Sequence, residues 1–137
     1  MGYTLKEIKD IRRRAKAARL SGAYLLWQYP NWSLQSICNG IGPEAFPKVL
    51  RDFISLLHPT LIPAACIHDI EWYRNGGSPA EFMDSNNRLK VNGCLMARWR
   101  YRWFDPRRYV VMHQARRFAR LCTLFGWPAW ISARKER

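Results

Sequence analysis

Two helical segments separated by a two-glycine turn constrain the fold of this chain more than any other feature. Residues 63–75 follow a helical pattern that begins with Pro63, which fits the first turn of a helix. Gly76-Gly77 ends this pattern, and Ser78 with Glu81 forms the capping box of a second helix over residues 79–95. Because the turn is so short, the sequence predicts that the two helices pack side by side as an antiparallel hairpin.

Within this hairpin, the positions of His68 and Asp84 indicate that they lie at the same height. His68 stands about eight residues before the centre of the turn and Asp84 about seven after it, so each is roughly 11–13 Å away along its helix. Adjacent residues on a helix point about 100° apart, so His68 and Asp69 face different neighbours. The sequence does not fix the rotation of the helices, and whether His68 faces Asp84 stays open.

The remaining segments indicate a single, mainly α-helical domain with three parts: residues 1–35, 36–97 and 98–137. Thr4 and Glu7 form a capping box for an N-terminal amphipathic helix that stops at Ser21-Gly22. Its basic residues indicate a solvated face, with a helix lying on a membrane as the alternative. Residues 24–32 fit a short strand, a helical turn or an extended arm. Further helices are expected over residues 47–57 and 107–125, and the helix from residue 79 continues to residue 103 in one interpretation.

The charge and aromatic content restrict the partners without choosing between two of them. The 137 residues carry a net charge of +13, with seven Trp and six Tyr. Such a chain attracts polyanions, and its aromatic residues suit either a membrane interface or single-stranded nucleic acid. Four widely spaced cysteines predict neither a disulfide framework nor a zinc site. The N-terminus has no apolar signal segment, so we expect synthesis in the cytoplasm without a signal peptide. Reaching another membrane then requires lysis, a virion or a dedicated export route.

A glycine loop, the His68-Asp69 pair and Asp84 follow one another in an order that resembles the phospholipase A2 superfamily. The loop is Cys38-Asn39-Gly40-Ile41-Gly42-Pro43, and the similarity covers about residues 36–95. The compact bacterial and viral branches of that family are the most similar. The resemblance implies a two-helix catalytic core with a preceding calcium loop, flanked here by N- and C-terminal amphipathic helices. It also implies hydrolysis of a glycerophospholipid acyl ester, and a role in phage, virion-associated or bacterial effector proteins.

The resemblance also implies a role for each site residue. The backbone carbonyls of Cys38, Gly40 and Gly42 join the Asp69 carboxylate around Ca²⁺, a cation that prefers oxygen ligands. His68 acts as the general base that activates water. Asp84 holds the imidazole and stabilises the imidazolium, as an aspartate does in hydrolase triads.

Some residues depart from the family pattern. Trp72 stands four residues after the histidine, where the family has a tyrosine that supports the distal aspartate, and Tyr73 follows it. Trp72 and Tyr73 are therefore the expected support of the catalytic network. Ala64 and Ala65 replace the paired cysteines of the family. These changes fit a relative poor in disulfides, and they equally fit a decayed site that keeps only the fold.

Outside the similar region, the C-terminal part is rich in arginine and aromatic residues. We expect a contact with a membrane or another polyanion from five of them: Arg98, Arg100, Arg102, Trp127 and Trp130. A packed helical pair with a basic outer face is the simpler alternative. Two functions follow. The first is a calcium-dependent phospholipase A2-like hydrolase on an anionic phospholipid membrane surface. The second is a non-enzymatic protein on the same scaffold, which binds nucleic acid or builds a virion.

Overall fold

The computed structural model describes residues 3–38 and 47–135, and it confirms a mainly α-helical chain: no β-strand occurs in these ranges. The helices are α1 (Leu5–Ala17), the 3-10 helix η1 (Ala23–Trp27), α2 (Asn31–Ile37), α3 (Lys48–Ser55), the 3-10 helix η2 (Pro59–Leu61), α4 (Ile62–Tyr73), α5 (Pro79–Arg100), α6 (Pro106–Phe125) and α7 (Trp127–Lys135).

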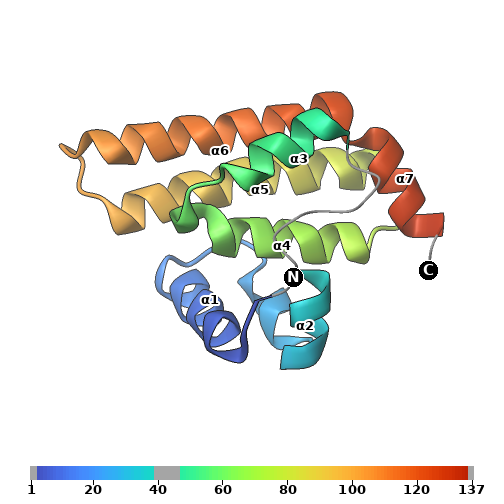
Figure 1. Ribbon diagram of the computed structural model, residues 1–137, viewed down its shortest axis with the longest axis horizontal. Coiled ribbons are helices and arrows are strands. Elements are labelled where there is room, and N and C mark those ends of the chain that lie inside the picture. The colour runs from blue at the N-terminus through green and yellow to red at the C-terminus, as the bar shows by residue number, and fades with distance from the viewer. Residues whose placement is uncertain (1–2, 39–46, 136–137) are drawn as a thin grey trace.

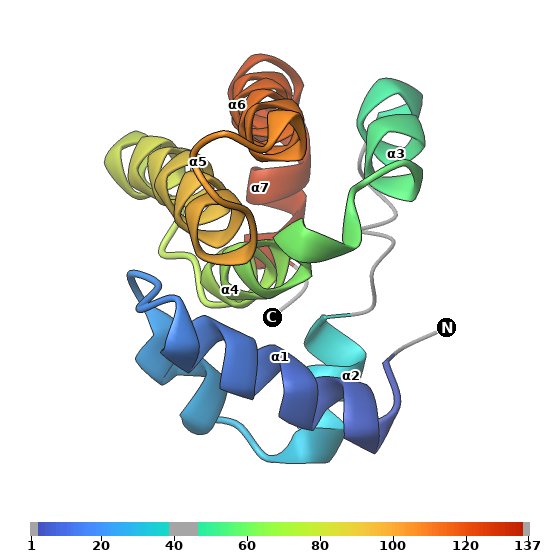
Figure 2. The ribbon, with the colours of Figure 1, turned by 90° about the vertical axis from the view of Figure 1, so that its left-hand side faces the viewer.

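The helices form layers around α4. The long helices α5 and α6 pack against each other on one side of α4, and α3 lies against α6 (Figure 1). The view along the bundle shows α1 and α2 on the opposite side of α4 (Figure 2). Helix α7 closes the end of the bundle near the turn between α4 and α5. Helix α4 is therefore covered on both sides.

The sequence of α4 explains its central position. Apolar residues occupy all of its sides, and a helix that is hydrophobic all round is buried. Seven of its twelve residues are buried: Pro63, Ala64, Cys66, Ile67, His68, Ile70 and Trp72. Helix α4 also carries His68, Asp69 and Glu71. Because the helix is covered on both sides, His68 is buried and the two acidic side chains are partly buried.

The expected hairpin of α4 and α5 forms and Ser78 caps α5, but the Glu81 carboxylate bonds the Gly76 amide instead of closing the expected capping box on the Ser78 amide. The Ser78 hydroxyl accepts a hydrogen bond from the Glu81 amide at 3.0 Å, and the Gly76 amide donates to the Glu81 carboxylate at 2.8 Å. Gly77 has a φ of 87°, which glycine adopts without strain. Helix α5 continues to Arg100, beyond residue 95, because residues 96 and 97 still pack into the core.

Helices α5 and α6 approach most closely where two small residues meet. A Cβ atom built on Gly93 would lie 2.4 Å from the Cβ of Ala115, which is far below van der Waals contact. Glycine at this position therefore permits the close packing of the two backbones. This contact fixes the pairing of α5 and α6 along their length.

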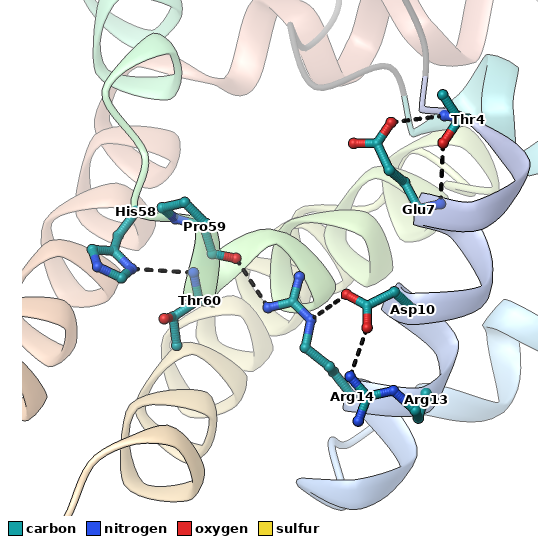
Figure 3. A network of polar contacts seen from close by, with 8 residues as sticks. All are labelled: Thr4, Glu7, Asp10, Arg13, Arg14, His58, Pro59 and Thr60. Atoms are coloured by element: carbon teal, nitrogen blue, oxygen red, sulfur yellow. Dashed lines mark hydrogen bonds and ion pairs between the residues drawn. The ribbon is translucent and has the colours of Figure 1, made fainter.

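The N-terminal layer is held by arginine side chains of α1. The segment over residues 24–32, whose conformation the sequence left open, contains the 3-10 helix η1 and the start of α2. Arg12 attaches this segment to α1 by donating to the backbone carbonyls of Leu26 at 2.9 Å and Tyr29 at 3.0 Å. Arg14 bonds the carboxylate of Asp10 and reaches the Pro59 carbonyl at 3.2 Å, which links α1 to η2 (Figure 3). The capping box of Thr4 and Glu7 is confirmed (Figure 3).

Helix α7 corrects the expectation that Trp130 contacts a membrane. Trp130 is only 1% exposed and its ring packs edge-on against Trp72 and Phe82, with centroids 5.5 Å and 5.6 Å away. Its carbonyl accepts a hydrogen bond from the buried Asn75 side chain at 3.2 Å. An apolar ring at the end of the bundle is better placed against the aromatic core than in water, so Trp130 is a core residue.

Across residues 3–38 and 47–135, no single helix is long and apolar enough to cross a membrane. Residues 48–55 and 59–73 reach the necessary length and apolar content only together, as two helices bent by 108°.

Candidate functional site

The side chains of His68, Asp69 and Glu71 on α4 lie in three different surroundings. His68 hydrogen-bonds to α5, Glu71 forms an ion pair with Arg88 of α5, and Asp69 lies within electrostatic reach of Tyr3 in the N-terminal layer. Burial shifts the pKa of each of these groups. Several shifted ionisable groups on one buried helix are typical of a functional site.

His68 is held as a neutral base. Its ring nitrogen Nε2 lies 2.9 Å from Oδ1 of Asn86, and the rings of Trp72 and Phe118 pack against it with centroids 5.0 Å and 6.1 Å away. Burial lowers the pKa of His68 to about 4, against the opposing effect of the Asn86 hydrogen bond. With the amide oxygen facing the ring, Nε2 carries the proton and donates it to Asn86, so the lone pair is on Nδ1.

The partner of His68 is Asn86, which corrects the expected pairing with Asp84. Residues that are two positions apart on a helix point roughly 200° apart, so Asn86 and Asp84 lie on nearly opposite sides of α5. Asp84 is exposed and lines a different pocket. The sequence holds a signal for Asn86: it stands at helical spacing with Phe82 and Leu89, both buried. A polar residue on such an apolar stripe needs a polar partner.

Asp69 is partly buried and has no hydrogen bond or ion pair with any other residue of the described ranges. Burial raises the pKa of its carboxyl to about 8. Tyr3 lies within electrostatic reach of both Asp69 and Cys38, and the buried Cys38 thiol donates to the Cys66 carbonyl at 3.6 Å. Asp69 also lies within electrostatic reach of Cys66 on its own helix and of Cys122 on α6. Gly40 and Gly42 lie outside the described residues.

These surroundings suit a hard cation. A carboxylate withdrawn from water without a counter-charge favours the binding of a positive ion, and oxygen ligands are those that Ca²⁺ prefers. Within residues 3–38 and 47–135, no group of three His, Cys, Asp or Glu side chains is arranged to hold a metal. A calcium site at Asp69 would draw on backbone carbonyls if the expected ligands Cys38, Gly40 and Gly42 supply them.

The shifted pKa values predict how stability depends on pH. Between pH 3.8 and about 8, folded Asp69 keeps a proton that the unfolded chain has lost, so the free energy of unfolding falls as pH rises. His68 acts in the opposite sense, but only between about pH 4 and 6.5. Glu71, whose pKa is raised by burial to about 7, acts in the same sense as Asp69 up to that pH. Between pH 7 and 8 we therefore expect Asp69 to lower the free energy of unfolding by about 1.4 kcal/mol per pH unit.

Urea unfolding at several pH values, in the presence of a chelator, measures this effect. Asp69→Asn is expected to flatten the dependence and to be more stable than the wild type at pH 8. Asp52→Asn is the matched control, since Asp52 is an exposed carboxylate paired with Lys48 on α3. An unchanged slope in Asp69→Asn would show that Asp69 titrates normally.

The two residues expected to support the network separate in the structure. Trp72 is buried against His68 and shields the imidazole from water. Tyr73 is 47% exposed and packs edge-on against Tyr29, so it supports the outer side of α4.

The sequence analysis did not predict a role for Glu71. In the structure, Glu71 lines a polar pocket of about 320 Å³ together with Arg74, Asp84 and Arg88. Burial raises the pKa of Glu71 to about 7, although the Arg88 guanidinium opposes this shift. A carboxyl on an otherwise apolar helix is the sequence signal for this position. The ion pair of Glu71 with Arg88 joins α4 to α5.

The connection between α5 and α6, drawn in orange at the left of Figure 1, carries exposed basic and aromatic side chains. Arg98, Arg100 and Arg102 are exposed there and form no ion pair with another described residue. Beside them, Trp103 is 72% and Phe104 is 61% exposed. Trp127 lies apart from this surface: it is 37% exposed and packs against Phe82. The sequence predicted that Trp127 and Trp130 contact a membrane or polyanion together with the arginines. In the structure, the exposed aromatic residues beside the arginines are Trp103 and Phe104.

No protein-family model, curated protein or solved structure matches the chain.

Proposed function

We propose that the chain is a calcium-dependent phospholipase A2-like hydrolase that cleaves an acyl ester of a glycerophospholipid. The observation that carries the proposal is the arrangement around α4. A buried, neutral His68 is oriented by a polar residue of the antiparallel helix, and the adjacent Asp69 lies within electrostatic reach of Tyr3, as does Cys38 at the start of the glycine loop. This split between a base and a cation-binding carboxylate on neighbouring residues is what the resemblance requires.

His68 would accept a proton from the attacking water at Nδ1, because its Nε2 proton is donated to Asn86. Its low pKa keeps the ring neutral and available at neutral pH. Asn86 fixes the ring orientation, as an asparagine does in papain-like triads. A neutral amide stabilises the imidazolium less than a carboxylate does, so proton transfer is less favoured than with aspartate. His68 is 2% exposed, and access of the ester requires a local opening.

Asp69 and the carbonyls of the 38–42 loop would hold the calcium ion. When bound, the ion polarises the ester carbonyl and stabilises the negative charge that develops on it. The Asp69 carboxyl, with its pKa of about 8, would lose its proton as the ion binds. Calcium affinity should therefore increase as pH rises toward 8.

Release of fatty acid from mixed phospholipid vesicles, measured with and without calcium, tests the proposal. We expect Asp69→Asn to weaken calcium binding in calorimetry and to leave little activity at any calcium concentration. The control is Asp52→Asn, which also removes one carboxylate and should behave as the wild type. Activity that persists in chelator, or calcium binding by Asp69→Asn equal to that of the wild type, would show that the metal assignment is wrong.

A second candidate function is supported by the surface at the α5–α6 connection. Exposed Trp103 and Phe104 next to unpaired arginines resemble the stacking and charge used to bind single-stranded nucleic acid. On a lipase, the same residues serve as an anchor on anionic lipid. Tight, steeply salt-dependent binding of an oligonucleotide, together with no binding to anionic vesicles, would favour the non-enzymatic protein.

A further inference from the structure

A groove of about 290 Å³ runs between α5 and α6. The buried residues Asn86 and Ala119 form its floor. Three exposed cationic side chains stand around it: Lys90 from α5, with Arg116 and Arg120 from α6. The floor residue Asn86 is the same residue that holds His68.

The charges around the groove favour an anion. Lys90, Arg116 and Arg120 form no ion pair with any residue in the described ranges, and no acidic residue lines the groove. The pocket at Glu71 is different, since the acids Glu71, Glu81 and Asp84 line it together with two arginines. Three uncompensated cations around one groove create a local positive potential that attracts an anion.

Asn86 supplies a second, independent observation. Its side chain is 2% exposed, and its amide nitrogen Nδ2 has no hydrogen-bond partner among the described residues. The amide oxygen is already used by His68. A buried N–H group without an acceptor is unfavourable. Because Asn86 lines the groove, an acceptor oxygen at the groove floor would satisfy this N–H group.

The rim of the groove indicates what the anion is attached to. Met83 and Leu124 are 51% and 61% exposed and lie beside the cations. We propose that this groove binds a phosphate oxyanion, through Lys90, Arg116, Arg120 and the Asn86 amide. The phosphate belongs either to a phospholipid headgroup, whose apolar part contacts Met83 and Leu124, or to free phosphate. Phosphate binding in the groove does not require ester hydrolysis, so it can be tested separately from the proposed reaction.

Occupancy of the groove has a consequence for His68. A phosphate accepts hydrogen bonds, so Nδ2 of Asn86 must face it, and Oδ1 must then face His68. This orientation requires the proton of the neutral imidazole to be on Nε2 and leaves the lone pair on Nδ1. The bound anion therefore reinforces the tautomer that His68 of α4 already adopts in its hydrogen bond with Asn86.

Calorimetric titration with inorganic phosphate tests the site. The groove variant is Lys90→Gln with Arg116→Gln and Arg120→Gln. The matched control is Arg98→Gln with Arg100→Gln and Arg102→Gln, which removes the same charge at the α5–α6 connection. Lys90 and Arg98 are about 12 Å apart along α5, more than the ~10 Å screening length at 0.1 M salt. We expect the groove variant to lose about tenfold or more in affinity, and the control to lose little.

The two sources of phosphate are separated with vesicles of phosphatidylglycerol and phosphatidylcholine. If the ligand is a headgroup, Met83→Gln with Leu124→Gln weakens vesicle binding and leaves the affinity for inorganic phosphate unchanged. If the ligand is free phosphate, this rim variant changes neither, and vesicles do not compete with phosphate.

Nitrogen NMR of the Asn86 side chain reports the contact. We expect saturating phosphate to shift the Nδ2 resonance of Asn86, and the groove variant to lose this response. Three results would overturn the proposal: no phosphate binding by the wild type, equal losses in the groove variant and its control, or an unchanged Asn86 side-chain amide resonance at saturation. An oligonucleotide that binds through the groove residues, while phosphate and vesicles do not, would also overturn it.

Discussion

Replacing His68 with alanine is expected to abolish ester hydrolysis while the chain stays folded. Loss of a catalytic base costs on the order of 10²–10⁴ in rate. The side chain touches Trp72, Phe118 and Asn86, so its removal leaves a small buried cavity and one unpaired amide, which the folded core can tolerate. The measurement is fatty-acid release from vesicles in calcium, with circular dichroism recorded on the same sample.

His113→Ala is the matched control, because His113 is an exposed histidine on α6. It should keep wild-type activity. Asn86→Asp provides a further readout: a buried carboxylate next to the ring should raise the pKa of His68 from about 4, which NMR titration measures. Full activity in His68→Ala with an unchanged circular dichroism spectrum would refute the mechanism.

Replacing Trp130 with alanine is expected to lower the free energy of unfolding by about 3–5 kcal/mol, as large aromatic truncations in cores do. Trp130 contacts Trp72 and Phe82, and Asn75 bonds its backbone. The loss is a large share of the roughly 5–15 kcal/mol that stabilises a typical domain. Urea unfolding measures it.

Trp32→Ala is the control, since Trp32 is 74% exposed and its truncation should change stability little. Equal unfolding midpoints for Trp130→Ala and the wild type would show that α7 does not pack as described. The Trp130 result also decides how vesicle experiments are interpreted. Weaker vesicle binding by a variant at this position would reflect its lower stability, so the exposed Trp103 is the residue to change when an interfacial contact is tested.

The hairpin of α4 and α5 was predictable because its signals are local. Gly77 has a positive φ, and the Ser78 hydroxyl accepts from the Glu81 amide in the first turn of α5 whatever surrounds them. The capping box at Thr4 was predictable for the same reason. Helix α7 was not predicted, because Pro128 and the short length of the segment weaken its periodic pattern. Its helical state depends on the burial of Trp130 against α4 and α5.

The candidate site was predictable only in part. The height of His68 along the hairpin follows from counting residues, and its partner is indeed a polar residue of α5. The identity of that partner depends on the rotation of α5, which is set by packing across the whole bundle, including the contact of Gly93 with Ala115. Asp84 and Asn86 differ by two positions, and this difference alone decides which side chain faces His68.

The distribution of the tryptophans determines what optical spectroscopy will report. Trp72 and Trp130 are buried in one cluster with Phe82, whereas the others are from 37% to 74% exposed. Emission from the native protein will therefore resemble that of indole in water, and its wavelength will change little when the chain unfolds. The near-ultraviolet circular dichroism of the buried pair will report the closure of α7. Emission and its quenching will report instead what covers the outer surface.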